Sequence, residues 1–394
     1  PTIFIACPWT PLGGGMFKVA DYLIQSQAAE VPPGHARLQP LDTRGGGGAA
    51  ASLPVLARAI GQVARARREG LAGVHVNMAE RLSLVRKCLL LAACHRLGVP
   101  VVLHLHAAQL HRAWPRLPAP ARGLVRWVFS LPRCCIVLGQ ESARFVSHEL
   151  GVPRERIEVV VNGVPAPTLP RQLRGDGLNL LFVGNLSARK GVPELLRAMA
   201  LPSLATLPVT LTLAGGGALE EWRAMAAYLG VSRRVRFEGW ADAPRLAQLL
   251  SQADALVLPS HDEGLPLAIL EALAQGVPVV CTPVGEIPHA LHDGQEAWFV
   301  PPGDPAALAR GLARVLSEPG LRGTLRARGL ARAAHRLQGQ LEVGGQEHFY
   351  LEGQIAYAIP LEQGQWRIHS STQHPGEVQH WVAHALGLAN HAVT

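Results

Sequence analysis

The chain has 394 residues, 48% of them hydrophobic, with a mean hydropathy of +0.15, which is enough for two or three domains with buried cores. Its apolar runs, such as residues 88–94, are much shorter than the roughly 18 residues of a membrane-spanning helix, so the sequence predicts none. The net charge of +8 comes almost entirely from arginine, since Lys18, Lys87 and Lys190 are the only lysines. Such a charge suits anionic lipid or phosphorylated ligands. No zinc-finger or RNA-binding pattern accompanies it, so we expect no nucleic acid partner.

The start of the chain and its cysteines indicate a cytoplasmic protein. Residues 1–7 are apolar without a basic leader or a cleavage-site spacing, and we expect a first strand there instead of a signal peptide. The six cysteines show no metal-ligand spacing, so we expect reduced thiols within the core.

The first 162 residues alternate short apolar runs with helical stretches of 10–20 residues, as parallel α/β units do. Asn162 and Gly163 mark the end of this pattern, and a proline-containing linker follows. We therefore predict a first domain over residues 1–165, with strands at residues 3–7, 73–77, 101–105, 134–138 and 157–161.

A second alternating set predicts a second parallel-sheet domain over residues 166–334, and two such domains imply a cleft between them. Ligands of these folds bind at the carboxyl ends of strands. Gly184, Gly215 and the Glu263-Gly264 loop all fall at such ends, as a nucleotide site requires. The predicted strands are residues 178–183, 209–214, 235–238, 255–258, 277–281 and 297–300.

The stretch from Glu263 to Glu271 is the most informative part of the sequence. It follows a strand-like run and leads into a helix that Pro266 is expected to begin and Gly276 to end. The free N–H groups of the helix start can hold a phosphate, and a carboxylate on either side suits hydroxyl groups. A nucleotide-sugar has this chemistry. The alternative is a loop acid and a surface helix residue, although the apolar neighbours of Glu271 leave little polar face.

Three further candidates follow predicted strands. Lys190 comes after a glycine turn from which it could reach the phosphates, but a plain surface lysine is an equal alternative. His106 ends a first-domain strand and would face the cleft, while His104 shares its side of the strand, so either could be a core or rim residue. The triple glycine after the first strand, of which we select Gly14 and Gly15, would let a backbone approach phosphate.

The segment around Glu263 and Glu271 resembles the paired-glutamate motif of the family 4 retaining glycosyltransferases, which have the two-Rossmann GT-B architecture. The resemblance covers residues 1–330 and implies hexose transfer from a nucleoside diphosphate sugar to a polysaccharide or lipid-linked acceptor, without cofactor or metal. It implies His106 and Glu263 at the sugar, Glu271 at the ribose, and Lys190 at the leaving diphosphate. The family has arginine where this chain has Asn185. The implied donor site comprises Gly14, Gly15, Asn185, Lys190, Gly215, Gly264, Leu265 and Glu271.

The composition changes near residue 335, after which histidine and glutamine are frequent. Residues 343–352 and 370–379 resemble the molybdenum-binding subunit of xanthine dehydrogenase, which implies that Gln346 corresponds to a glutamine beside molybdenum. Because the family's later motifs have no counterpart before Thr394, we expect residues 335–394 to be a short, foreign, non-catalytic α+β fragment. The apolar run of residues 355–360 is expected to lack its partner strands and so to favour aggregation.

Two alternatives to an active transferase follow. Asn185 and the altered C-terminus are also consistent with an inactive nucleotide-sugar-binding remnant of a chimeric or truncated gene, or with a fusion to a xanthine dehydrogenase fragment. The basic and aromatic stretch at residues 111–129 could make a peripheral contact with an anionic membrane at its inner face, or be an ordinary amphipathic helix.

Overall fold

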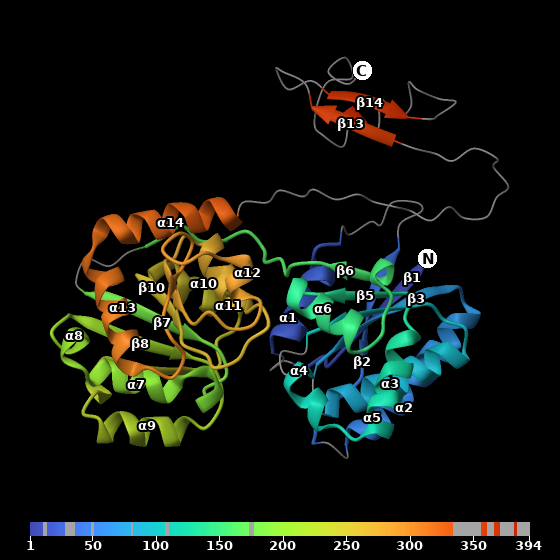
Figure 1. The fold of residues 1–394 in the computed structure, drawn as a ribbon, viewed down its shortest axis with the longest axis horizontal. Coiled ribbons are helices and arrows are strands. Elements are labelled where there is room, and N and C mark those ends of the chain that lie inside the picture. Colours follow the sequence, from blue (N-terminus) through green and yellow to red (C-terminus); the bar gives the residue numbers. More distant parts are fainter. Residues whose placement is uncertain are drawn as a thin grey trace. The chain divides into compact units, whose positions relative to one another are not determined.

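A computed structural model describes residues 1–10, 14–27, 36–48, 51–79, 82–106, 110–172, 177–333, 356–360, 366–370 and 382–383. The chain forms two compact units, Pro1–His335 and Arg336–Thr394. The first unit holds two parallel six-stranded sheets, each flanked by helices (Figure 1). The prediction of two successive parallel-sheet domains is therefore confirmed.

The first sheet has the order β2-β1-β3-β4-β5-β6. Its edge strand β2 was not predicted, because Pro40 interrupts the pattern. Proline cannot donate to a ladder, but an edge strand has one unpaired side and tolerates it. The strands are β1 Thr2–Cys7, β2 Arg37–Asp42, β3 Leu71–Met78, β4 Val101–Leu105, β5 Cys134–Val137 and β6 Ile157–Val159. The helices are α1 Gly15–Gln25, α2 Ser52–Arg68, α3 Leu82–Arg96, α4 Leu110–Ala113, α5 Ala119–Ser130 and α6 Gln140–His148, with 3-10 turns η1 Trp114–Arg116 and η2 Arg154–Arg156.

The second sheet has the order β12-β11-β10-β7-β8-β9, so the strand order reverses between β7 and β10. In open α/β sheets this reversal opens a crevice at the carboxyl ends. The strands are β7 Leu178–Val183, β8 Val209–Ala214, β9 Val235–Gly239, β10 Ala255–Leu258, β11 Val279–Cys281 and β12 Trp298–Phe299. The helices are α7 Val192–Ala200, α8 Pro202–Ala205, α9 Leu219–Tyr228, α10 Ala243–Gln252, α11 Leu267–Ala274, α12 Ile287–Ala290, α13 Pro305–Ser317 and α14 Pro319–Ala333, with η3 Ala188–Lys190 and η4 Ser232–Arg234.

The helix that begins between Glu263 and Glu271, α11, starts and stops almost as its sequence predicts. Pro266 is its N-cap with an extended backbone, one residue before the expected role as first helical residue. Gly276 follows the C-cap at φ +69°, and its N–H donates to the Leu273 carbonyl while the Val277 N–H donates to the Ala272 carbonyl. This pair of bonds is the Schellman termination.

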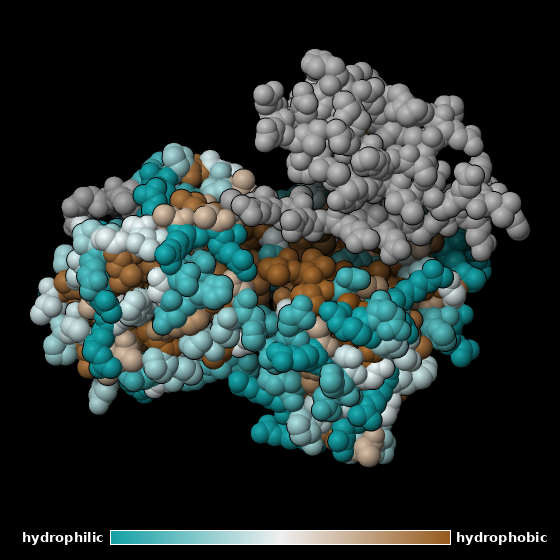
Figure 2. Space-filling view, turned by 45° about the horizontal axis from the view of Figure 1, so that its top comes forward, coloured by the Kyte–Doolittle hydropathy of each residue, from teal (hydrophilic) through white to brown (hydrophobic). Residues whose placement is uncertain are grey.

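One face of the first unit is seen in the space-filling view. Figure 2 shows mostly hydrophilic residues on the visible face, with hydrophobic residues gathered near its middle. Among the helices of the described ranges, none has the length and apolar character needed to cross a bilayer.

The described part of the second unit contains one hairpin. β13 (Ala356–Pro360) pairs antiparallel with β14 (Trp366–Ser370). The expectation that the apolar run at residues 355–360 lacks partner strands was wrong, since β14 supplies one from the same unit. Gln346 lies outside the described residues.

Candidate active site

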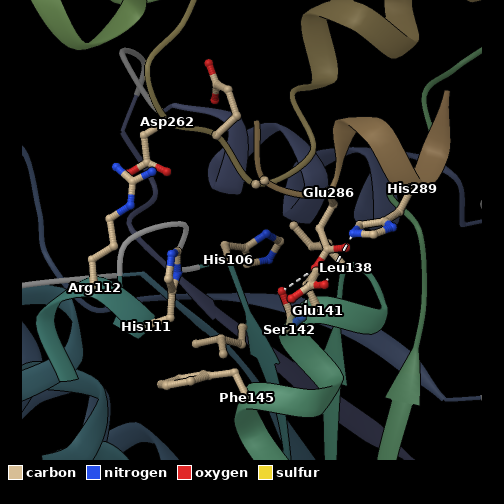
Figure 3. Close-up of a pocket in the computed structure, with 14 residues that line it drawn as sticks. His106, His111, Arg112, Leu138, Glu141, Ser142, Phe145, Asp262, Glu286 and His289 are labelled. Carbon is tan, nitrogen blue, oxygen red and sulfur yellow. Dashed lines mark hydrogen bonds and ion pairs between the residues drawn. The ribbon is translucent and has the colours of Figure 1, made fainter. Parts of the chain in front are cut away.

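A cavity of about 320 Å³ lies between the carboxyl edges of the two sheets (Figure 3). Both domains contribute to its wall, and among the sequence-predicted residues His106, Glu263 and Gly264 line it. The other lining residues are Leu105, His111, Arg112, Leu138, Glu141, Ser142, Phe145, Asp262, Gly285, Glu286 and His289.

Glu263 and Lys190 form an ion pair at the point where the order of the second sheet reverses. Their side chains are 7% and 14% exposed, so the pair is largely shielded from water. The Ser260 hydroxyl donates to the same carboxylate oxygen at 2.7 Å. Lys190 comes from the end of η3 after β7, and Glu263 from the loop after β10. The two strands that flank the crevice thus bring together two residues 73 positions apart.

Glycines allow the loops around this pair to pack backbone against backbone. Gly215 has φ +156°, and a Cβ there would overlap the Gly184 carbonyl oxygen. In the same way, a Cβ at Gly191 would overlap the carbonyl of Pro259, and one at Gly285 the carbonyl of Glu263. The loops after β7, β8, β10 and β11 therefore form one close-packed rim.

His106 follows β4 and contacts Asn77 Oδ1 through Nε2 at 2.9 Å. The centroid of its ring lies 4.0 Å from that of His104, with the two rings tilted by 36°, and the His104 ring stacks on that of His75 at 5.5 Å. Burial, together with the charge of a protonated His75, lowers the pKa of His106 to about 3. His106 is therefore neutral at physiological pH, and beside a ligand it can act as a hydrogen-bonding imidazole but not as a cation.

Glu271 contacts two side chains of the first domain. Its Oε1 accepts hydrogen bonds from Lys18 Nζ and from the Tyr22 hydroxyl, both at 2.8 Å. Lys18 and Tyr22 lie four residues apart on α1 and so share one face of that helix. Burial, followed by the proximity of Glu271, raises the pKa of Tyr22. The phenol therefore stays protonated and donates.

A second carboxylate of the second domain, Glu286, contacts the start of α6. Its Oε1 accepts from the Ser142 N–H at 2.8 Å and from the Ser142 hydroxyl at 2.7 Å (Figure 3). Glu286 is 3% exposed and thus acts as the anionic cap that the free N–H groups of a helix start favour. Gly139 leaves room for it, because a Cβ at that position would overlap the carboxylate.

The remaining predicted residues lie around this core. Gly14 is the exposed N-cap of α1, and a Cβ on Gly15 would be 3.9 Å from Leu267, the first residue of α11. The starts of α1 and α11 therefore meet. Asn185 is exposed beside Gly184, and Leu265 is buried with its carbonyl accepting from Asn162 Nδ2 at 3.3 Å.

Sequence reasoning missed Lys18, Tyr22, Ser260 and Glu286. One signal was available, because a chain this rich in arginine has only three lysines. Lys18 and Lys190 each bind one of the paired glutamates, and Lys87 is buried with Nζ 2.6 Å from Thr43 Oγ1. No comparable signal marks Glu286, whose partners are the backbone N–H and the hydroxyl of Ser142 in the other domain.

Within the described ranges, no group of three or more histidine, cysteine or acidic residues is arranged to hold a metal ion. All six cysteines are free thiols, and Cys7, Cys94, Cys135 and Cys281 are buried.

Three sequence families match the chain in succession. Residues 36–166 match "Glycosyltransferase Family 4", residues 177–318 match "Glycosyl transferases group 1", and residues 317–394 match "Molybdopterin cofactor-binding domain". The last match begins at the end of α13 and includes α14, which packs against α11.

Among curated proteins, the glycogen synthase of Mycobacterium tuberculosis is 34% identical over 233 residues, covering 56% of this chain and 55% of that protein. The D-inositol 3-phosphate glycosyltransferase of Frankia alni is 38% identical over 201 residues, covering 46% and 49% respectively. The chain thus spans about half the length of the curated relatives it matches.

Among solved structures, HepE of Anabaena in complex with UDP and glucose superimposes with a TM-score of 0.64 at 19% identity. The match covers 84% of this chain and 94% of that one. At this identity the likeness concerns the fold, which is the same pair of facing sheets.

Proposed function

We propose that this chain, whose two sheet domains belong to glycosyltransferase families and adopt the GT-B fold, transfers a hexose from a nucleoside diphosphate sugar with retention of configuration. The observation that carries the proposal is the shielded Lys190–Glu263 pair in the crevice of the second sheet, with Glu263 lining the same cavity as His106. The acceptor in this proposal is a polysaccharide or a lipid-linked glycan, and no metal or cofactor takes part.

The leaving diphosphate would lie at Lys190 and the start of α11. The ammonium group and the N–H groups of Leu267 and Ala268 are fixed before the ligand arrives, so they can stabilise charge that develops on the diphosphate. In the reaction the bond between C1 and the diphosphate oxygen breaks, and a bond to the acceptor oxygen forms on the same face of the sugar. The acceptor proton leaves with the diphosphate. Glu263 and the neutral His106 would hold the sugar.

Glu271 would bind the ribose hydroxyls. Lys18 and Tyr22 both donate to Oε1, while Oε2 accepts no hydrogen bond from the described residues. The carboxylate is therefore oriented from one side and open on the other. This arrangement supports a role for the first domain in positioning a donor-binding group of the second.

Calorimetric titration of the full chain with UDP, GDP and UDP-glucose tests the donor site. HepE binds UDP in its solved structure, which makes UDP the first choice. Saturable binding is expected, at least tenfold weaker in Lys190→Ala and Glu271→Ala, because each removes a charged hydrogen bond worth about 1.5–3 kcal/mol. Glu221→Ala, on the exposed start of α9, is the control. Equal affinities in all three variants would refute the site.

A second candidate function is an inactive nucleotide-sugar-binding protein, and Asn185 favours it because the position carries no cation. Incubating the protein with radiolabelled donor and a mixed pool of lipid-linked acceptors distinguishes the two. Transfer or slow donor hydrolysis supports the enzyme, whereas binding alone supports the inactive protein.

The C-terminal unit has no part in the proposed reaction. Deleting residues 337–394 should leave UDP affinity within about twofold, and elemental analysis of the full chain should find no stoichiometric molybdenum. Bound molybdenum, or loss of UDP binding on deletion, would contradict this.

A further inference from the structure

The outer face of α3 carries an apolar stripe that no described element covers. Leu82, Val85 and Leu89 are 55%, 56% and 50% exposed, and their spacing of three and four residues puts them on one side of the helix. An isolated exposed leucine needs no explanation, but a helical stripe of three is a feature of interaction surfaces.

The neighbouring helices extend this stripe. α2 and α5 each pack against α3 on the same side of the first sheet (Figure 1). Leu53 on α2 is 59% exposed, and Leu124 and Trp127 on α5 are 58% and 48% exposed. Half of the large hydrophobic residues that the described chain exposes thus lie on these three adjacent helices.

Within α2, α3 and α5 every acidic or basic side chain is basic. α2, α3 and α5 contain no aspartate or glutamate. They carry exposed arginines at positions 58, 65, 67, 68, 96 and 126. By contrast, α7 and α9 of the second domain contain Glu194, Glu220 and Glu221. The helices that expose leucine and tryptophan thus carry arginine without a compensating acid, as α14 of the second domain also does.

Exposed apolar side chains together with arginines on one surface distinguish between the partners that could bind there. A second copy of the chain would bring the same cations to the same surface and be repelled. Nucleic acid would pair with the arginines but would leave the leucine and valine side chains without apolar contact. A bilayer with anionic headgroups suits both kinds of side chain. Its acyl boundary accepts the apolar side chains, and its negative surface stabilises binding by about 1 kcal/mol for each nearby arginine.

We propose that α2, α3 and α5 form a docking surface for an anionic lipid bilayer, with Leu53, Leu82, Val85, Leu89, Leu124 and Trp127 entering its interface. α3 begins only four residues after β3 ends at Met78, beside Asn77, the partner of His106. Docking would thus bring a lipid-linked molecule to the edge of the sheet that lines the cavity. The surface itself does not depend on the proposed transferase activity.

Co-sedimentation of the full chain with vesicles tests the proposal. Binding to equimolar phosphatidylglycerol and phosphatidylcholine is expected, at least tenfold weaker with phosphatidylcholine alone and weaker in 0.5 M salt. The double variant Val85→Glu/Leu89→Glu should lose at least tenfold in vesicle affinity, and Trp127→Glu at least threefold. Tyr228→Glu, on the 90% exposed tyrosine that ends α9 in the second domain, is the matched control and should bind like the unaltered chain.

UDP titration of the same variants shows whether they are folded and keeps the two proposals separate. Retained UDP affinity with lost vesicle affinity supports the docking surface. Failure to bind anionic vesicles, equal binding to phosphatidylcholine, or an equal loss in Tyr228→Glu would overturn it. It would also be overturned if sedimentation velocity showed a dimer that Val85→Glu/Leu89→Glu dissociates.

Discussion

The carboxyl edges of the two sheets face one cavity but are built differently. The edge of the second sheet holds a shielded ion pair inside loops that glycines pack backbone against backbone. The edge of the first sheet holds uncharged imidazoles, and its charged and hydroxyl donors reach across to carboxylates of the second domain. The edge of the second domain is thus held together by its own residues, whereas the donors of the first domain form hydrogen bonds to carboxylates of the second.

This difference predicts how each domain responds to substitution. Substitutions at the edge of the second sheet should abolish donor binding or destabilise the domain, because the ion pair there is shielded and the loops leave no room for larger side chains. Changes in the first edge should alter orientation or pH response. Four experiments test this contrast.

Glu263→Gln should have the largest effect. The amide keeps the shape of the side chain but removes the negative charge that pairs with Lys190, so transfer or donor hydrolysis should fall by about 10²–10³-fold. Rates with the donor that binds best measure it. Glu238→Gln, in an exposed pair with Arg245 of the same domain, serves as the control. If Glu263→Gln and Glu238→Gln had equal rates, the proposed difference between the two edges would be contradicted.

Gly215→Ala should destabilise the second domain by about 3 kcal/mol, because the added methyl group overlaps the Gly184 carbonyl at a φ that alanine disfavours. Gly216→Ala is the matched control, since open space surrounds its Cβ. Urea unfolding of both variants gives the two free energies. Equal free energies of unfolding would show that the loops rearrange around the methyl group at little cost.

The histidine stack of the first domain should make stability depend on pH. Burial lowers the pKa of His75 from 6.5 to about 4, and His104 is lowered further for the same reason. Below about pH 6.5 these histidines become protonated in the unfolded chain but stay neutral in the folded protein. The free energy of unfolding should therefore fall as the pH drops, by up to about 1.4 kcal/mol per unit for each histidine.

Thermal unfolding between pH 7.5 and 5 measures this loss. The variant His75→Leu/His104→Leu should make the dependence less steep, with His106 still contributing, whereas His292→Leu, on an exposed histidine, should not change it. A dependence as steep in the double variant as in the unaltered chain would assign the effect to other groups.

Tyr22→Phe and Lys18→Met should have the smallest effects. Each leaves Glu271 in place but frees its orientation, so the KM for donor should rise about three- to tenfold while kcat changes little. The loss should largely disappear with a 2′-deoxyribose donor, which lacks a hydroxyl for Glu271. Leu23→Ala, exposed on the same helix, is the control. A loss of kcat with KM unchanged would contradict a positioning role.

How far the sequence predicts the structure also differs between the domains. β7, β8 and β10 begin and end where their apolar runs do, because buried parallel strands read as continuous hydrophobic segments. β2 was not predicted because Pro40 interrupts its pattern, and only its position at the edge of the sheet makes the proline tolerable. Glu263, Lys190 and His106 could be found because each follows a strand and matches a family motif. Lys18 and Glu271 meet across 253 residues, and such a contact depends on how the two domains face each other, which no local pattern encodes.

The close approach of Gly139 to Glu286 provides a way to separate the approach of the two domains from the proposed transfer reaction. Gly139 has an extended backbone at φ −173°, which any residue adopts, so only the neighbouring carboxylate excludes a side chain. Gly139→Ala would act as a wedge that keeps the domains apart while leaving Lys190, Glu263 and the second-domain crevice unaltered. It would make a splayed conformer accessible to scattering and crystallisation, in which donor capture could be observed without turnover.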